Sequence, residues 1–362
     1  MDKRRGCPTL LLVRVAILLF IALPALASDS LQWSGFALLR ASNRPERVPF
    51  DDHAVSAQVQ LGIDWDPSLR FGGHLHLLAR NDGDGGDRAR FGVVEAYLEQ
   101  KFYPGEDRIR IMEGAFFLPT SRENVDALWE SPYTISPSAL NSWMGEEFRP
   151  IGIDASYTWR HAITIGGTAF TGNDTFGALP AGRGWMLRDH WALLGEHLEA
   201  GFGNYSSVSA ETDHRIGWSA RARWSNDFAL VQLTHIDNRA DALQHGELYN
   251  WETRFDIAGA SVNWNDWTVA AEDGWGPTAI NVYGSNYKDD LVAKYLLVSR
   301  RVGNHRVSIR GDGFQTGESH RHALTVAWFW APAGPFRTGV EVMTSGRDHK
   351  VSAEVRYNFA GH

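Results

Sequence analysis

The sequence contains a single cysteine, Cys7, which lies in a basic segment at the start of the chain. Without a second cysteine the chain cannot form an internal disulfide, and no cysteine-ligated metal site is expected. After residue 27 no stretch approaches the ~20 consecutive apolar residues that a membrane-spanning helix needs. No linker rich in proline, glycine or serine divides the chain, which favours one unit over two domains. The net charge of −8 argues against nucleic acid as a partner.

The first 27 residues have the pattern of a targeting segment. Residues 3–5 are basic, residues 10–23 are apolar except for Arg14, and residues 25–27 read Ala-Leu-Ala. A basic start, a short apolar run and a small-residue site are typical of a secretory signal peptide. We therefore expect residues 1–27 to be a signal peptide and the exported chain to begin at Ser28. An uncleaved membrane anchor is the alternative.

The rest of the chain shows a period of two. Every second residue from Val55 to Trp65 is apolar, and the residues between them are polar or glycine. This alternation predicts strands with one apolar and one polar face. We expect sixteen such strands, at 31–41, 53–66, 69–80, 90–103, 108–118, 150–160, 162–172, 216–226, 228–237, 251–263, 267–275, 291–301, 306–315, 322–331, 336–345 and 349–359.

The connections between these segments alternate in length. Short turns such as 66–68, 160–161 and 265–266 alternate with longer loops, of which 119–149 and 173–215 are the longest. Short turns on one side and longer loops on the other are typical of outer-membrane barrels. Aromatic residues gather beside the short turns, as expected of an interfacial girdle: Trp65, Phe102, Tyr103, Trp159, Trp224, Trp264, Trp267, Trp328 and Trp330.

These patterns predict an all-β protein: a transmembrane antiparallel β-barrel of about 16 strands over residues 28–362, located in the outer membrane. Its apolar face then contacts outer-membrane lipid. A soluble β-sandwich or propeller is the alternative fold. The last strand alternates from Val351 to Phe359 and resembles the signal recognised by the barrel-assembly machinery, although three residues follow Phe359.

One segment carries a family resemblance. The sequence IRIMEGAFFLPTSREN, residues 109–124, resembles the hairpin and loop of the phosphate-selective porins of the O and P type. More broadly, the chain resembles Gram-negative outer-membrane porins. The resemblance implies a third outer loop, 119–149, that folds inward and narrows the pore, and by analogy a homotrimer. No substrate-binding lysine ladder is present, so phosphate itself is not implied.

Charged residues define the expected pore. We expect the constriction to be lined by Arg122, Glu123, Asp126, Glu130, Glu146, Glu147 and Arg149. Strand parity places ten basic residues on the pore wall: Arg70, Arg80, Arg110, Arg221, Arg223, Arg254, Lys294, Arg300, Arg310 and Arg356. Their excess predicts a weak anion preference. Two simpler interpretations stay open. The wall charges face inward only because charge is costly against lipid, and residues 119–149 form an external lid and not a constriction.

These observations predict a porin, a channel for passive diffusion of small hydrophilic solutes or ions. A barrel plugged by its own loops, acting as a receptor or scaffold, is the first alternative, and an outer-membrane hydrolase using His74 or His76 is the second. No nucleophile motif or phosphate-binding loop is present, so we expect neither an enzyme nor a cofactor. Asp82, Asp84 and Asp87 stand in a glycine-rich stretch and are a weak candidate for a Ca²⁺ site. Residues 182–198 have the spacing of a short helix.

Overall fold

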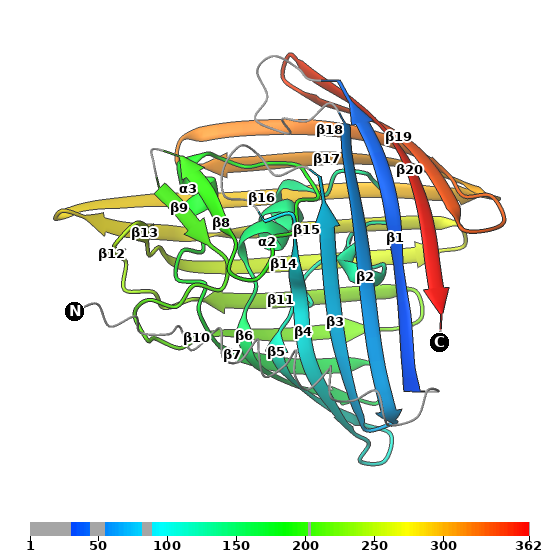
Figure 1. The fold of residues 1–362 in the computed structure, drawn as a ribbon, viewed down its shortest axis with the longest axis horizontal. Coiled ribbons are helices and arrows are strands. Elements are labelled where there is room, and N and C mark those ends of the chain that lie inside the picture. The colour runs from blue at the N-terminus through cyan, green and yellow to red at the C-terminus, as the bar shows by residue number, and fades with distance from the viewer. Residues whose placement is uncertain (1–29, 44–54, 82–88, 202–203, 362) are drawn as a thin grey trace.

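A computed structural model of the chain describes residues 30–43, 55–81, 89–201 and 204–361 (Figure 1). The predicted signal peptide and the acidic stretch with Asp82, Asp84 and Asp87 lie outside these residues. The described elements are β1 (Leu31–Ser42), β2 (Val55–Ser68), β3 (Phe71–Arg80), β4 (Phe91–Phe102), β5 (Arg108–Ala115), η2 (Ala127–Trp129), α2 (Ala139–Glu147), β6 (Ile151–Trp159), β7 (Ile163–Thr171), α3 (Ala178–Gly182), β8 (His197–Gly201), β9 (Asn204–Ser207), β10 (Gly217–Ser225), β11 (Ala229–Asp237), β12 (Gln244–His245), β13 (Leu248–Tyr249), β14 (Glu252–Trp264), β15 (Trp267–Val282), β16 (Ser285–Val302), β17 (His305–Thr316), β18 (Ser319–Trp330), β19 (Phe336–Ser345) and β20 (Asp348–Gly361).

Sixteen of these strands form a closed antiparallel barrel, in which each strand pairs with its neighbours in chain order. The barrel closes where β1 pairs with β20, from Trp33 opposite Gly361 to Ser42 opposite Ser352. Closure removes the sheet edges, so every strand has a hydrogen-bonding neighbour on both sides. The predicted sixteen-stranded all-β barrel is confirmed.

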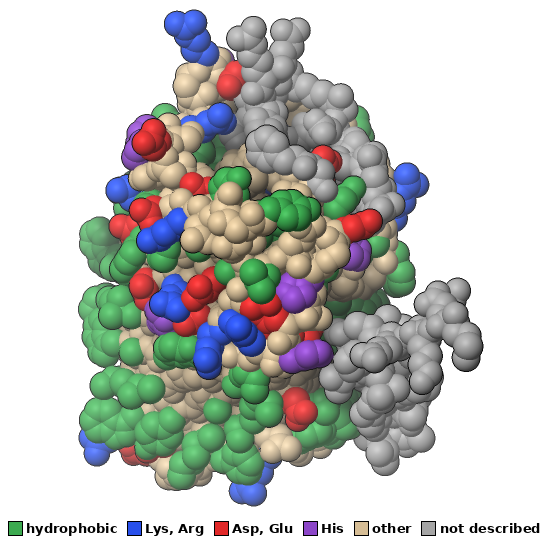
Figure 2. Space-filling view, turned by 90° about the vertical axis from the view of Figure 1, so that its left-hand side faces the viewer, with side chains coloured by type: hydrophobic (Ala, Val, Ile, Leu, Met, Phe, Trp, Pro, Cys, Tyr) green, Lys and Arg blue, Asp and Glu red, His purple; other side chains and the backbone are tan. Residues whose placement is uncertain are grey.

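The outer face of the barrel is apolar across its middle. Val326, Val340 and Val355 are exposed there and alternate with buried inward residues on their strands. The aromatic residues beside the short turns also point outward; Trp224, Trp264 and Trp330 are examples. Figure 2 shows hydrophobic side chains along the left and lower margins of the molecule and charged side chains between them. So extensive an apolar surface needs an apolar surrounding, which on a closed barrel is lipid.

The two ends of the barrel differ. At one end, called here the turn end, tight turns join the strands; the β6–β7 turn places Arg160 and His161 at positive φ, 44° and 58°. At the other, the loop end, the connection between β7 and β10 contains α3, β8 and β9, and a small sheet of order β12-β13-β9-β8 lies outside the barrel ladder.

No helix among the described residues is long and apolar enough to cross a membrane.

Three local expectations are wrong. Residues 276–290, expected to be a loop, continue β15 and β16 up to a turn at Tyr283 and Gly284. Residues 182–198 form no helix beyond the end of α3 at Gly182. Their apolar side chains instead pack separately into hydrophobic clusters inside the barrel. The alternation of apolar and polar residues in 108–118 breaks near Met112, which predicts a bulge. Instead, β5 pairs without a register shift, and Glu113 lies exposed on the outer face.

The outer face yields a test. Changing Val326→Arg on β18 places a charge in the apolar band and should lower the free energy of unfolding by about 2–4 kcal/mol. His320→Arg, on the same face of the same strand near the loop end, should cost only about 0–1 kcal/mol. Denaturant titration of protein folded into lipid vesicles measures both. Equal small costs would contradict contact between Val326 and lipid.

Candidate functional site

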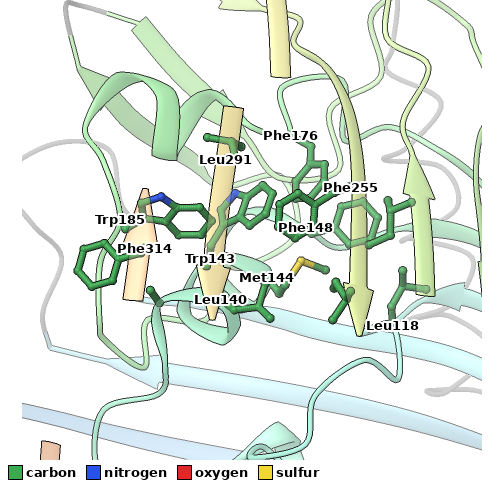
Figure 3. Close-up of a cluster of buried hydrophobic side chains, with 14 of the residues drawn as sticks. Leu118, Leu140, Trp143, Met144, Phe148, Phe176, Trp185, Phe255, Leu291 and Phe314 are labelled. Carbon is green, nitrogen blue, oxygen red and sulfur yellow. The ribbon is translucent and has the colours of Figure 1, made fainter. Parts of the chain in front are cut away.

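The segment from Phe116 to Pro150 folds into the barrel and packs against its inner wall. Figure 3 shows Trp143, Met144 and Phe148 beside Phe255 of β14, Leu291 of β16 and Phe314 of β17. The ring of Trp143 stacks on Phe176 with 4.4 Å between centroids. The same cluster includes wall residues from β5, β7, β11, β18 and β19. At this height the barrel therefore holds a hydrophobic core.

Arg310 of β17 is the most heavily bonded contact between wall and loop. It is fully buried and donates hydrogen bonds to the Glu123 carboxylate at 3.1 Å, the Asp312 carboxylate at 2.8 Å and the Ser136 carbonyl at 2.6 Å. A buried charge is tolerated only when it is paired and hydrogen-bonded. Arg310 thus fixes the loop against the wall.

Carboxylates bind the loop elsewhere around the barrel. Glu341 of β19 accepts hydrogen bonds from the backbone N–H groups of Ile135 (2.7 Å) and Ser136 (3.1 Å). Glu272 of β15 accepts one from the Asn141 amide at 2.8 Å, and Glu95 of β4 accepts one from the Phe117 N–H at 2.7 Å. The loop is therefore held on three sides of the lumen.

A second inward segment, residues 173–196, is fixed in the same way. Arg40 of β1 pairs with Asp189 at 2.5 Å, and Arg80 of β3 pairs with Glu196 at 2.5 Å. All four side chains are buried. We call residues 116–150 and 173–196 together the plug.

The two segments of the plug are also bound to each other. Glu146 pairs with both Arg183 and Arg188, and Glu147 accepts the N–H groups of Gly177 and Leu179, each at 3.1 Å. The plug is thus one packed body and not two independent loops.

The predicted constriction residues lie in the lumen, but most do not face an open channel. Arg122, Glu123, Glu130, Glu146, Glu147 and Arg149 are buried, and Asp126 is exposed. Arg149 lies over the Phe117 ring, 3.2 Å from its centroid, and donates to the Gly145 carbonyl. These charges serve chiefly as internal contacts of the plug.

The ten basic residues predicted for the pore wall divide into three groups. Six residues face inward: Arg80, Arg110, Arg221, Arg223, Arg310 and Arg356. Arg70 lies in the exposed β2–β3 turn.

Three assignments of that set need correction: Arg254, Lys294 and Arg300 point outward. Arg254 pairs with Glu252 and Asp237 on the outer surface, and Arg300 lies over the Trp267 ring at 5.0 Å. Parity from sequence assumed that polar residues face in. On β14 and β16 apolar residues such as Phe255 and Leu291 face in instead, because the plug offers them an apolar partner.

The structure adds residues that the sequence analysis missed. Asp189 and Glu196 carry the contacts of the second segment, yet no local pattern in 173–215 distinguishes them. One acidic group, Asp174, Glu211 and Asp213, has ligand atoms within 4.8 Å of one another and could hold a cation. Burial and the neighbouring carboxylates raise the pKa of Asp174 to about 7.

The fold and its inward loop define a class: a transmembrane β-barrel of porin architecture. No family model and no curated protein sequence matches the chain.

Solved structures do match the fold. OmpF of Salmonella typhi, in a complex with daunomycin, has a TM-score of 0.58 at 10% identity, over 91% of this chain and 97% of that one. A loop L8 deletion mutant of OmpT, an outer membrane protein of Vibrio cholerae, has a TM-score of 0.58 at 8% identity, over 91% and 99%. A refined porin structure has a TM-score of 0.51 at 12% identity, over 91% and 100%. The chain has the porin fold.

Glu130 makes the plug sensitive to pH. Burial raises the pKa of Glu130 to about 7; Asp189 and Glu354 add to the rise, while Arg356 and Arg337 oppose it. The unfolded chain would titrate near the ordinary value of 4.5. Because the folded chain then holds the extra proton between these values, stability falls as pH rises from about 4.5 to about 7 and levels off above.

We therefore expect hydrogen exchange in residues 119–149 to speed up between about pH 5 and about pH 8, after correction for the intrinsic exchange rate. Glu130→Gln, which is neutral at every pH, should weaken this dependence. Burial raises the pKa of Glu147 to about 7 as well, so a residual slope is expected. Corrected exchange that is flat with pH in the unchanged protein would contradict the assignment.

Proposed function

We propose that the protein is an outer-membrane porin that passes small hydrophilic solutes or ions. The observation that carries this is the loop 116–150, which lies inside a closed barrel with an apolar outer face. The porin fold of the matched structures supports the same conclusion. Export through residues 1–27 and insertion by the barrel-assembly machinery through β20 belong to this proposal.

The lumen has a polar vestibule at the turn end. Asp64, Lys101 and Arg110 of the wall are partly exposed there, as is Asp126 of the plug. Toward the loop end the plug packs against the barrel wall through hydrophobic contacts and ion pairs, which are not covalent. Solute passage then depends on how far residues 119–149 can move away from their packed position in the lumen.

A weak anion preference fits the charges of the vestibule. Glu99 is paired with both Lys101 and Arg110. In contrast, Arg223 and Arg306 have no carboxylate within ion-pair distance among the described residues, although Arg306 donates a hydrogen bond to the Ser299 hydroxyl. Uncompensated positive charge along a pore favours anions.

The plug also supports a second function. A hydrophobic cluster that joins both plug segments to strands around the barrel would seal a channel, as expected of a receptor or scaffold. The hydrolase alternative has less support, because His74 is held by Asp64 at 2.7 Å and His76 by Gln60 at 2.8 Å as parts of the wall. A homotrimer remains a prediction by analogy.

Removing the plug separates the channel from the receptor. Replacing residues 121–147 with a short glycine-serine linker should raise single-channel conductance in planar bilayers severalfold over the intact protein. The outer-surface change Arg254→Gln serves as the control and should leave conductance unchanged. A silent intact protein with a conducting deletion variant would favour the receptor. Silence of both would contradict the channel.

Ion selectivity tests the vestibule charge. In a potassium chloride gradient the reversal potential of the intact protein should have the sign of chloride preference. Arg306→Glu should shift it toward cation preference, because the change adds two negative units beside the path. A cation-selective intact protein would overturn the anion preference.

A further inference from the structure

Arg223 of β10 is an inward arginine near the turn end, and no hydrogen bond or ion pair joins it to another of the described residues. Its Nε atom is buried and has no hydrogen bond among the described residues. Three other arginines, Arg108, Arg122 and Arg221, lie close enough to repel its guanidinium. Among the described residues, Arg221 is the one of these three that forms an ion pair, through two contacts with Asp154 at 2.5 and 2.7 Å. We call Arg108, Arg122 and Arg223 the arginine triad.

Strand register places Arg108 and Arg223 in one row across the inner wall. Arg108 is opposite Thr158, Thr158 is opposite Thr164, and Thr164 is opposite Arg223. The two threonine hydroxyls lie 3.0 Å apart. The row therefore has an arginine at each end and two small polar side chains between them.

The plug brings the third arginine to this row. Gln232 of β11 is the register partner of Arg223, and its Oε1 accepts a hydrogen bond from Arg122 Nη2 at 3.4 Å. Gly259 of β14 leaves room for this approach: a Cβ there would lie 3.1 Å from Cγ of Arg122. The remaining bonds of Arg122 go to the carbonyls of Pro119 and Thr120, which carry no net charge.

Among the described residues, no carboxylate forms an ion pair with the triad. Asp154 is paired with Arg221, and Glu272 attracts Arg122 without an ion pair while it accepts hydrogen bonds from Asn141 and Tyr295. Arg108 and Arg223 have no carboxylate partner among these residues. Guanidinium groups held together against their repulsion attract an anion, and they bind phosphate, sulfate and carboxylate groups through paired N–H donors.

We propose that the arginine triad is an oxyanion-binding site, which takes the phosphate, sulfate or carboxylate group of a small solute in the vestibule. Thr158 and Thr164 lie on the wall beneath it. This proposal rests on the proposed channel and names its substrate class. The resemblance of residues 109–124 to phosphate-selective porins stays a prediction and is not part of the argument.

Sulfate is the probe, because its charge does not change near neutral pH. Isothermal titration of the detergent-solubilised, full-length protein should show saturable binding of sulfate. Arg223→Gln should weaken sulfate binding about tenfold or more, because it removes the charge-assisted hydrogen bonds that a guanidinium donates to an oxyanion. Arg223→Lys keeps the positive charge but loses the paired N–H donors of the guanidinium, so it should give an intermediate loss of sulfate affinity. Because Arg223 has no hydrogen bond within the described residues, these variants should keep the circular dichroism of the fold.

The matched control is Arg337→Gln, which removes the same charge from a lumen arginine paired with Glu354 on the opposite wall. It should change sulfate affinity less than about twofold if binding is local. Equal losses of sulfate affinity in Arg223→Gln and Arg337→Gln would overturn the site, because binding would then depend on the overall positive charge of the lumen. Unchanged affinity in Arg223→Gln would overturn it as well. Sulfate binding in a protein that does not conduct would support the site and refute the channel. Conduction without saturable binding would do the reverse.

Discussion

Along the seam between β1 and β20, backbone groups pair from Trp33 opposite Gly361 to Ser42 opposite Ser352. This closure matters because hydrocarbon offers no hydrogen-bond partners, so a sheet can enter lipid only when it has no free edge. Once the sheet is closed, its two faces meet different surroundings. The outer face is apolar because lipid is apolar, whereas the inner face depends on what the chain itself places in the lumen.

In this protein the chain places a packed body there. Arg310, Arg40 and Arg80 join the wall to Glu123, Asp189 and Glu196 of the plug. Such pairs are costly to desolvate, and a plug held by them gains defined position more than stability. A hydrophobic core inside the barrel supplies the cohesion that the ion pairs lack. The vestibule beyond the plug stays polar, and the arginine triad lies at the boundary between the two.

Strand existence was predictable because a period of two repeats over many residues and is reinforced by turn residues at fixed intervals. All sixteen predicted strands appear, and the girdle of tryptophans faces outward beside the turns. The wrong assignments of Arg254, Lys294 and Arg300 to the pore wall have one origin. The rule that polar side chains face the lumen was applied to β14 and β16, where Phe255 and Leu291 face in and Arg254 and Lys294 face out. A period of two separates the two faces of a strand, but it does not determine which face points into the lumen and contacts the plug.

The sequence alone therefore determined the architecture: strand number, the alternation of turns and loops, and the apolar band, because each depends on neighbours along the chain. The tertiary structure alone decided the partners. Glu130 meets Arg356 across 226 residues, and Arg122 meets Gln232 across 110. A contact between a loop and a distant strand leaves no local pattern, since any inward position could have met that loop. Only the closed barrel brings them within reach.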